Sequence, residues 1–216
     1  MADDLSELIR AERLALIEFL EQLTTAQWAT DSLCSGWTVQ DVAAHIAWTP
    51  ALPPMVAARG FARAGFRVNT FIADSAVRWS RRGTAAILDQ LRRNAADGAK
   101  PIGVPAVAAL ADAVVHAMDI RRPLNNHRVI PHAAYAPTAD FFAGPSSRWP
   151  MSIPLRGNTR KRIAGLRLVA QDVEWAHGHG PDVCGSGEAV MLVLTGRPVG
   201  PGELTGPGAA ELYARL

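Results

Sequence analysis

Three side chains of types that bind divalent metals occur at a spacing that favours a single site. Asp112 and His116 lie four residues apart in an apolar stretch, 106–120, that is expected to be helical. Side chains four residues apart share one face of a helix, roughly 5–6 Å apart at Cβ, so both can reach one ion. His45 lies in another expected helix. A histidine from one helix, with a carboxylate and a histidine from another, makes a three-ligand set. Zinc or a similar divalent ion accepts this set and keeps a fourth position open for water or a thiol.

The same residues have a simpler interpretation. Aspartate and histidine four residues apart on a helix occur often by chance. A single histidine such as His45 on a mostly apolar helix is more often an interior residue whose hydrogen bonds are satisfied. The spacing by itself therefore leaves both interpretations open.

The N-terminal half of the chain is expected to supply the helices that position these residues. In the first helix, apolar residues recur at steps of three and four. Thr38 is a natural N-cap for the helix that carries His45, and Asp41 lies where a carboxylate favours a helix N-terminus. Residues 55–82 are interpreted as helical, and a further helix runs from 84 until Gly98 stops it. Four or so helices with short connections, ending with 106–120, predict an up-and-down bundle.

The pattern changes after about Pro123. Residues 133–142 are expected to form one more helix and 144–154 a linker. Residues 166–175 then alternate as strands do, followed by short helices at 188–194 and 209–216. The fold class predicted is mainly α, with a helical metal-binding bundle over residues 1–145 and a small α+β domain over 155–216. His177 and His179 are flanked by glycines and are interpreted as exposed residues of a turn.

Composition excludes several classes of protein. The 216 residues are 49% hydrophobic and 19% charged, with 22 basic and 20 acidic side chains, which is typical of a globular domain. The arginines, such as the group at 78, 81 and 82, are interpreted as solvated faces, so we expect no nucleic-acid partner. No segment approaches the ~18–20 uninterrupted apolar residues of a membrane span. Nothing in the sequence indicates an oligomeric state.

The number of cysteines indicates the cellular compartment in which the protein is expected. Cys34 and Cys184 are the only cysteines, which is too few for a disulfide framework, so a reducing cytoplasm is expected. Each is interpreted as a small buried filler rather than as a reactive thiol.

Two stretches carry a resemblance to a known family. The sequence SGWTVQDVAAHI at 35–46 closely resembles the "GWTVxDVxAHL" element of the mycothiol-dependent maleylpyruvate isomerase family, a branch of the DinB-like bundles. The sequence DAVVHAMDI at 112–120 is similar to its "ExxxHxxDL" element. The C-terminal run of DVEW, GHG, LTGRP and LTG resembles the small C-terminal domain of the family.

The resemblance implies roles for five residues. His45 and His116 are implied to bind the metal, with Asp112 in the position where the family usually has glutamate. Aspartate is one methylene shorter, so the ion must lie closer to the helix or bind more loosely. Asp119 is implied to orient a ligand or a neighbouring arginine, with the alternative that it is only a polar residue near a helix end. Arg197, in a "GRP" turn, is implied to bind a substrate carboxylate, with the alternative that it only ends a helix.

The resemblance also implies a function. The expected cofactors are a divalent metal, zinc first, and mycothiol, a low-molecular-weight thiol. The expected partner is a small electrophilic acid such as maleylpyruvate. In such an isomerisation the thiolate adds to a conjugated double bond, the resulting single bond rotates, and elimination gives the trans product. S-transfer, in which the thiol stays on the product, is a close variant. The alternative from another class is a non-catalytic member of the fold that senses a ligand or binds a partner.

Overall fold

The computed structural model of the chain describes residues 2–101, 103–144 and 158–216. Its contacts divide the chain into two compact units, Met1–Asn126 and His127–Leu216. The expected linker at 144–154 lies outside the described residues, apart from Gly144.

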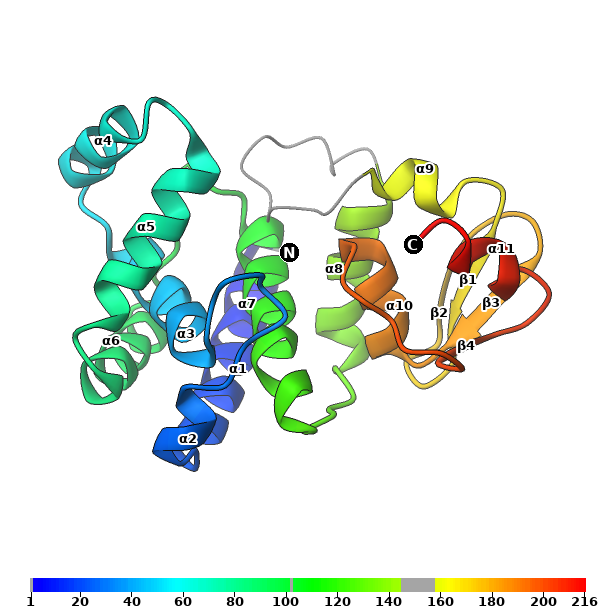
Figure 1. The fold of residues 1–216 in the computed structure, drawn as a ribbon, viewed down its shortest axis with the longest axis horizontal. Coiled ribbons are helices and arrows are strands. Elements are labelled where there is room, and N and C mark those ends of the chain that lie inside the picture. Colours follow the sequence, from blue (N-terminus) through cyan, green and yellow to red (C-terminus); the bar gives the residue numbers. More distant parts are fainter. Residues whose placement is uncertain (1, 102, 145–157) are drawn as a thin grey trace. The chain divides into compact units, whose positions relative to one another are not determined.

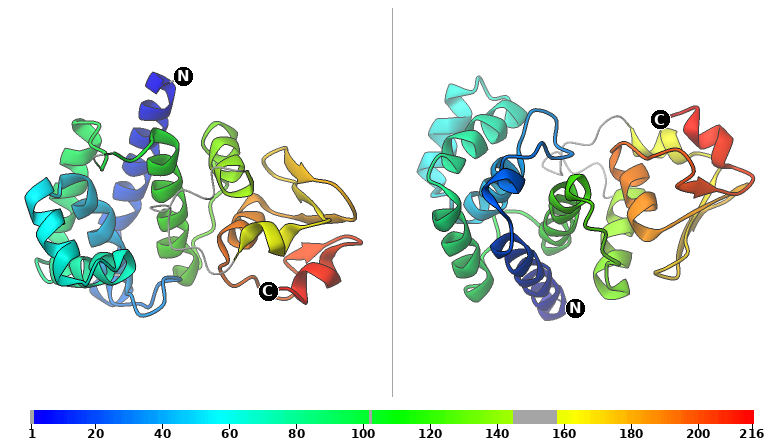
Figure 2. Two further views of the ribbon diagram at one scale, coloured as in Figure 1. Left: turned by 90° about the horizontal axis from the view of Figure 1, so that it is seen from above. Right: turned by 60° about the horizontal axis from the view of Figure 1, so that its bottom comes forward.

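The first unit is helical. Its elements are α1 (Ala2–Glu21), α2 (Thr25–Trp28), α3 (Val39–Trp48), η1 (Thr49–Ala51), α4 (Pro54–Arg63), α5 (Val68–Ser80), α6 (Thr84–Ala96), α7 (Ala106–Arg121) and η2 (Arg122–Leu124) (Figure 1). Helix α1 packs against α6 and α7, and α3 packs against α5, α6 and α7. Figure 2 shows α1 and α7 running side by side. The four helices α1, α3, α6 and α7 therefore surround one core.

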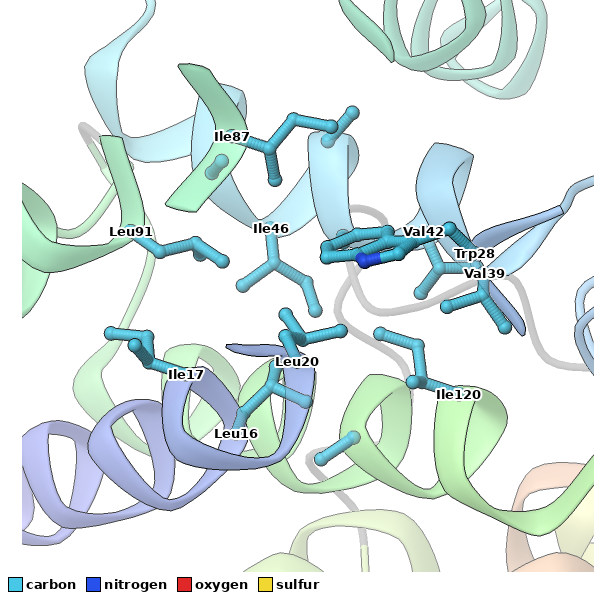
Figure 3. Close-up of a cluster of buried hydrophobic side chains, with 14 of the residues drawn as sticks. Leu16, Ile17, Leu20, Trp28, Val39, Val42, Ile46, Ile87, Leu91 and Ile120 are labelled. Atoms are coloured by element: carbon cyan, nitrogen blue, oxygen red, sulfur yellow. The ribbon is translucent and has the colours of Figure 1, made fainter. Parts of the chain in front are cut away.

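That core is built from apolar side chains of separate helices. Leu16 and Leu20 of α1 meet Ile46 of α3 and Leu91 of α6, and each of these side chains is at most 2% exposed (Figure 3). The three- and four-residue recurrence of apolar residues explains this, because it places them on the inner face of each helix.

Helix α3 begins with a capping box that is also tied to α5. The Thr38 hydroxyl accepts from the backbone N–H of Asp41 (3.2 Å), and the Asp41 carboxylate accepts from the Thr38 backbone N–H (3.0 Å). The same carboxylate accepts from the hydroxyl of Ser80 at the end of α5, at 2.6 Å. The N-cap predicted from the sequence is therefore present, and its aspartate also fixes α5 against α3.

The second unit combines helices with a small sheet. Its elements are α8 (His132–Ala143), α9 (Thr159–Ile163), β1 (Arg167–Ala170), β2 (Trp175–Gly178), β3 (Asp182–Gly185), α10 (Gly187–Thr195), β4 (Leu204–Thr205) and α11 (Ala209–Tyr213). The strand order is β2-β1-β3-β4, with β1 and β3 parallel and the outer pairs antiparallel. Helix α10 packs on β1, β3 and α8, and ends at Gly196, whose φ is 73°.

One turn predicted from the sequence is wrong in part. His177 lies in β2, paired with Leu168, and its ring stacks on Trp175 with the ring centroids 5.9 Å apart. The flanking glycines indicated a turn, but Gly178 closes the strand and only His179 follows it.

The mainly α fold with a small α+β part is confirmed. The contact-based boundary at Asn126 groups α8 with the second unit, whereas the sequence placed residues up to 145 with the first. The limits 1–145 and 155–216 stay a prediction about independently folding domains. In the described part of the chain no helix has both the length and the hydropathy needed to cross a membrane.

Candidate metal centre

Helices α3 and α7 bring His45, Asp112 and His116 together; these three residues are called the candidate metal centre. His45 Nε2 lies 3.6 Å from Asp112 Oδ1, and His116 Nε2 lies 3.5 Å from the same oxygen. One potential ligand atom from each of the three residues lies within 4.8 Å of the other two. The i,i+4 relation places Asp112 and His116 on one face of α7, and α3 packs beside that helix.

Hydrogen bonds behind the two rings determine which nitrogen is available. The Thr49 hydroxyl donates to the backbone carbonyl of His45 (2.8 Å), so at 3.1 Å it accepts from the Nδ1–H of the His45 ring. His116 Nδ1 lies 2.9 Å from the Asp119 carboxylate, which can only accept when ionised. A histidine that binds a metal through Nε2 therefore keeps its hydrogen on Nδ1 in both cases, and these hydrogen bonds turn each Nε2 toward Asp112.

The spacing of these atoms fits coordination better than hydrogen bonding. Neutral N–H···O hydrogen bonds are about 2.7–3.2 Å long, and both contacts to Asp112 are longer. Two ligand atoms on a tetrahedral zinc ion with bonds of about 2.0–2.1 Å lie roughly 3.3–3.4 Å apart. The distances of 3.5 and 3.6 Å are near that separation, and the shorter aspartate side chain reaches both histidines. The residues present fit a divalent ion.

A second layer of contacts holds His116. The Cys34 thiol donates to Asp119 Oδ2 at 3.1 Å, and the Leu33 backbone N–H donates to the Asp119 backbone carbonyl at 3.1 Å. Asp119 is fully buried, and His116 is 3% exposed. The loop before α3 thus contacts the end of α7 directly, and Asp119 links Cys34 to the His116 ring.

Electrostatics favour an ionised carboxylate in the centre. Burial by itself would raise the pKa of the Asp112 carboxyl, but the positive charge on His116 and the contacts with His45 outweigh it, so this pKa lies below its usual value. The charge of Arg13, which is 4% exposed on α1, acts in the same direction. Burial would lower the pKa of His116, yet the Asp112 charge and the hydrogen bond to Asp119 raise that pKa well above 6.5.

The two histidines of the centre are buried, whereas its aspartate is partly exposed. The side chains of His45 and His116 are 7% and 4% exposed, whereas that of Asp112 is 34% exposed. The Trp37 indole lies against the His45 ring, with the ring centroids 5.4 Å apart. A ligand would approach past Asp112, because the two imidazoles are enclosed by packed side chains.

Arg197 lies in the chain's second unit. It follows α10, is 7% exposed, and its Nη1 donates to the backbone carbonyl of Thr195 at 3.2 Å. Its role in binding a substrate stays a prediction.

Sequence reasoning missed several residues around the centre. Cys34 was interpreted as a buried filler, but it is half-buried and hydrogen-bonded to Asp119. Thr49 was not considered, although a threonine four residues after a helical histidine places its hydroxyl beside that residue. Arg13 was hidden within the amphipathic pattern of α1.

The fold and site together define a class of protein: a helical bundle with a candidate metal centre of two histidines and one aspartate, joined to a small α+β unit. A family model described as the mycothiol maleylpyruvate isomerase N-terminal domain matches residues 9–121, more than half of the chain. The chain belongs to this family.

Solved structures agree with the fold. A histidine-to-alanine mutant of the mycothiol-dependent maleylpyruvate isomerase has a TM-score of 0.61 at 15% identity, covering 97% of this chain and 94% of that one. A second structure of that isomerase has a TM-score of 0.55 at 14% identity, with the same coverage. No curated protein matches the sequence.

Proposed function

We propose that this protein is a metal- and mycothiol-dependent enzyme that acts on a small electrophilic acid such as maleylpyruvate, as an isomerase or an S-transferase. The observation that carries the proposal is the convergence of two imidazole Nε2 atoms on one carboxylate oxygen, at 3.5 and 3.6 Å. Family membership supports the thiol, because the structurally similar isomerase is named as mycothiol-dependent.

In this proposal His45, Asp112 and His116 hold the ion. A divalent ion bound there supplies a lowered pKa for a coordinated thiol, so that the nucleophilic thiolate is available at neutral pH. Zinc is the first choice for two imidazoles and a carboxylate.

The chain's other residues keep these ligands in one orientation. Asp119 accepts the Nδ1 proton of His116, and the Thr49 hydroxyl accepts that of His45. Each hydrogen bond fixes the orientation of its ring and directs Nε2 to the ion. The ring then loses less freedom when the metal binds, which raises metal affinity. Trp37 covers the His45 ring and excludes water from that side.

Thermal unfolding of the full chain with zinc alone, mycothiol alone, and both together tests the proposal. Zinc at about 100 times its Kd stabilises by about 2.7 kcal/mol, and mycothiol should add a further increase in Tm only when zinc is present. An equal shift by mycothiol without zinc contradicts the proposed coupling.

Product analysis then separates the two reactions. After incubation with maleylpyruvate, recovery of free mycothiol with the trans isomer indicates an isomerase, and a stable conjugate indicates an S-transferase. Neither product, with zinc and mycothiol bound, would instead favour a non-catalytic member of the fold.

A further inference from the structure

A cavity of about 440 Å³ lies in the first unit between the loop 35–37 and helix α5. Asp74 and Arg78 of α5 line it together with Arg81, the C-cap residue of that helix. Their spacing of four and then three residues places them on one face of that helix. The opposite wall is the loop, including Trp37. A volume in the range of about 300–1,000 Å³ is usual for small-molecule sites.

The guanidinium groups of Arg78 and Arg81 form no ion pair with any residue that the structure describes. Among the described residues, the side chains of Asp74, Arg78 and Arg81 make no hydrogen bond or ion pair, even though Asp74 and Arg78 have the i,i+4 spacing of a helical pair. Two arginines against one aspartate leave the lining with an excess positive charge. Arg82, next in the chain, differs because its guanidinium lies over the Trp79 ring, 5.2 Å from the ring centroid.

The cavity shares a wall with the candidate metal centre. Trp37 lines the cavity, and its indole also lies against the His45 imidazole. Helix α5, which forms the other wall, is held against the start of α3, because the hydroxyl of Ser80 donates to the Asp41 carboxylate. A molecule in the cavity is therefore one aromatic side chain away from a metal ligand.

We infer that this cavity binds the carboxylate of a small organic acid through Arg78 and Arg81. Guanidinium groups form charge-assisted and often bidentate hydrogen bonds with carboxylates, which are stronger than neutral ones. The inference rests on the proposed function, since the bound acid belongs to the class of substrate proposed there. It assigns recognition of the carboxylate to a cavity of the first unit whose Trp37 wall also contacts His45.

Calorimetric titration with maleate, a four-carbon dicarboxylate, tests the inference. The full chain is first treated with a chelator, so that maleate cannot bind through a metal ion in the candidate metal centre. At constant ionic strength, the double variant Arg78→Gln/Arg81→Gln should bind maleate at least about tenfold more weakly. Asp74→Asn removes the opposing charge and should tighten binding by about threefold, a gain that misfolding would not produce.

Arg82→Gln is the matched control, because it removes the same charge from the same segment but outside the cavity. Its maleate affinity should equal that of the unmodified protein. The inference is overturned if the unmodified protein shows no saturable maleate binding, if the double variant binds equally well, or if Arg82→Gln loses as much affinity. Zinc binding and mycothiol binding are measured in separate titrations. If neither binds while maleate binds normally, the proposed function is refuted and the maleate site is retained.

Discussion

Among the single side chains, Asp119 connects His116 of the candidate metal centre to Cys34 in the loop before α3. It accepts from both His116 and Cys34 while fully buried. If its task is to orient His116, Asp119→Asn should weaken zinc binding by about 10- to 100-fold, because partners behind a ligand contribute on that scale. Competition with a chromophoric chelator measures the affinity.

Asp97→Asn serves as the control for that variant, since Asp97 is exposed at the end of α6. Its zinc affinity should be unchanged. Zinc affinity in Asp119→Asn equal to that of the control would show that Asp119 only fills a buried polar position.

The pKa of His116 predicts opposite pH effects with and without metal. Because that pKa is raised above 6.5, protonated His116 stabilises the metal-free fold. This stability is fully present below pH 6.5 and is lost as the pH rises through the raised pKa of His116. Zinc competes with that proton for Nε2, so zinc affinity should increase over the same rise in pH.

Urea unfolding of chelator-treated protein and zinc titrations, both between about pH 6 and pH 9, measure these effects. His116→Ala should lose the His116 contribution to the pH dependence of unfolding. A metal-free protein that becomes more stable across this range through His116 would contradict the assigned contacts.

Among the helices, the start of α3 is tied to the end of α5, and α3 carries His45. Asp41 closes the capping box and accepts from Ser80 of α5. Asp41→Ala should lower the free energy of unfolding by about 1–3 kcal/mol, because it removes a cap and a second hydrogen bond together. Urea denaturation checks the value.

Helix α2 offers a matched comparison. Gln27 occupies the equivalent position of another capping box, with Thr24, but that box is exposed. Within the described part of the chain, the Gln27 side chain bonds only to Thr24. Gln27→Ala should cost no more than about 1 kcal/mol. Similar losses from both variants would mean that the link to α5 contributes nothing.

For the whole molecule, patterns within one helix were predictable and contacts between distant segments were not. The pairing of Asp112 with His116 follows from helical spacing, and the cap at Thr38 from local chemistry. The inclusion of His45 needed the family resemblance, because no sequence rule states which faces of α3 and α7 meet.

Other contacts required coordinates. The approach of Cys34 to Asp119 depends on the path of the loop before α3, and sequence spacing does not specify that path. Strands β3 and β4 were also missed, because they have four and two residues and their register comes from pairing with neighbours. Arg78 and Arg81 were interpreted as a solvated face, since only the packing of loop 35–37 creates the cavity beside them.

The central claim is that one divalent ion is bound by His45, Asp112 and His116. Elemental analysis after zinc loading and dialysis tests it most directly, with His179→Ala as the control because His179 is an exposed histidine of the second unit. The unmodified protein and the control should each retain about one zinc per chain, and His45→Ala, His116→Ala and Asp112→Asn less than about a tenth of that. Negligible zinc in the unmodified protein, or equal zinc in all five, would contradict the account.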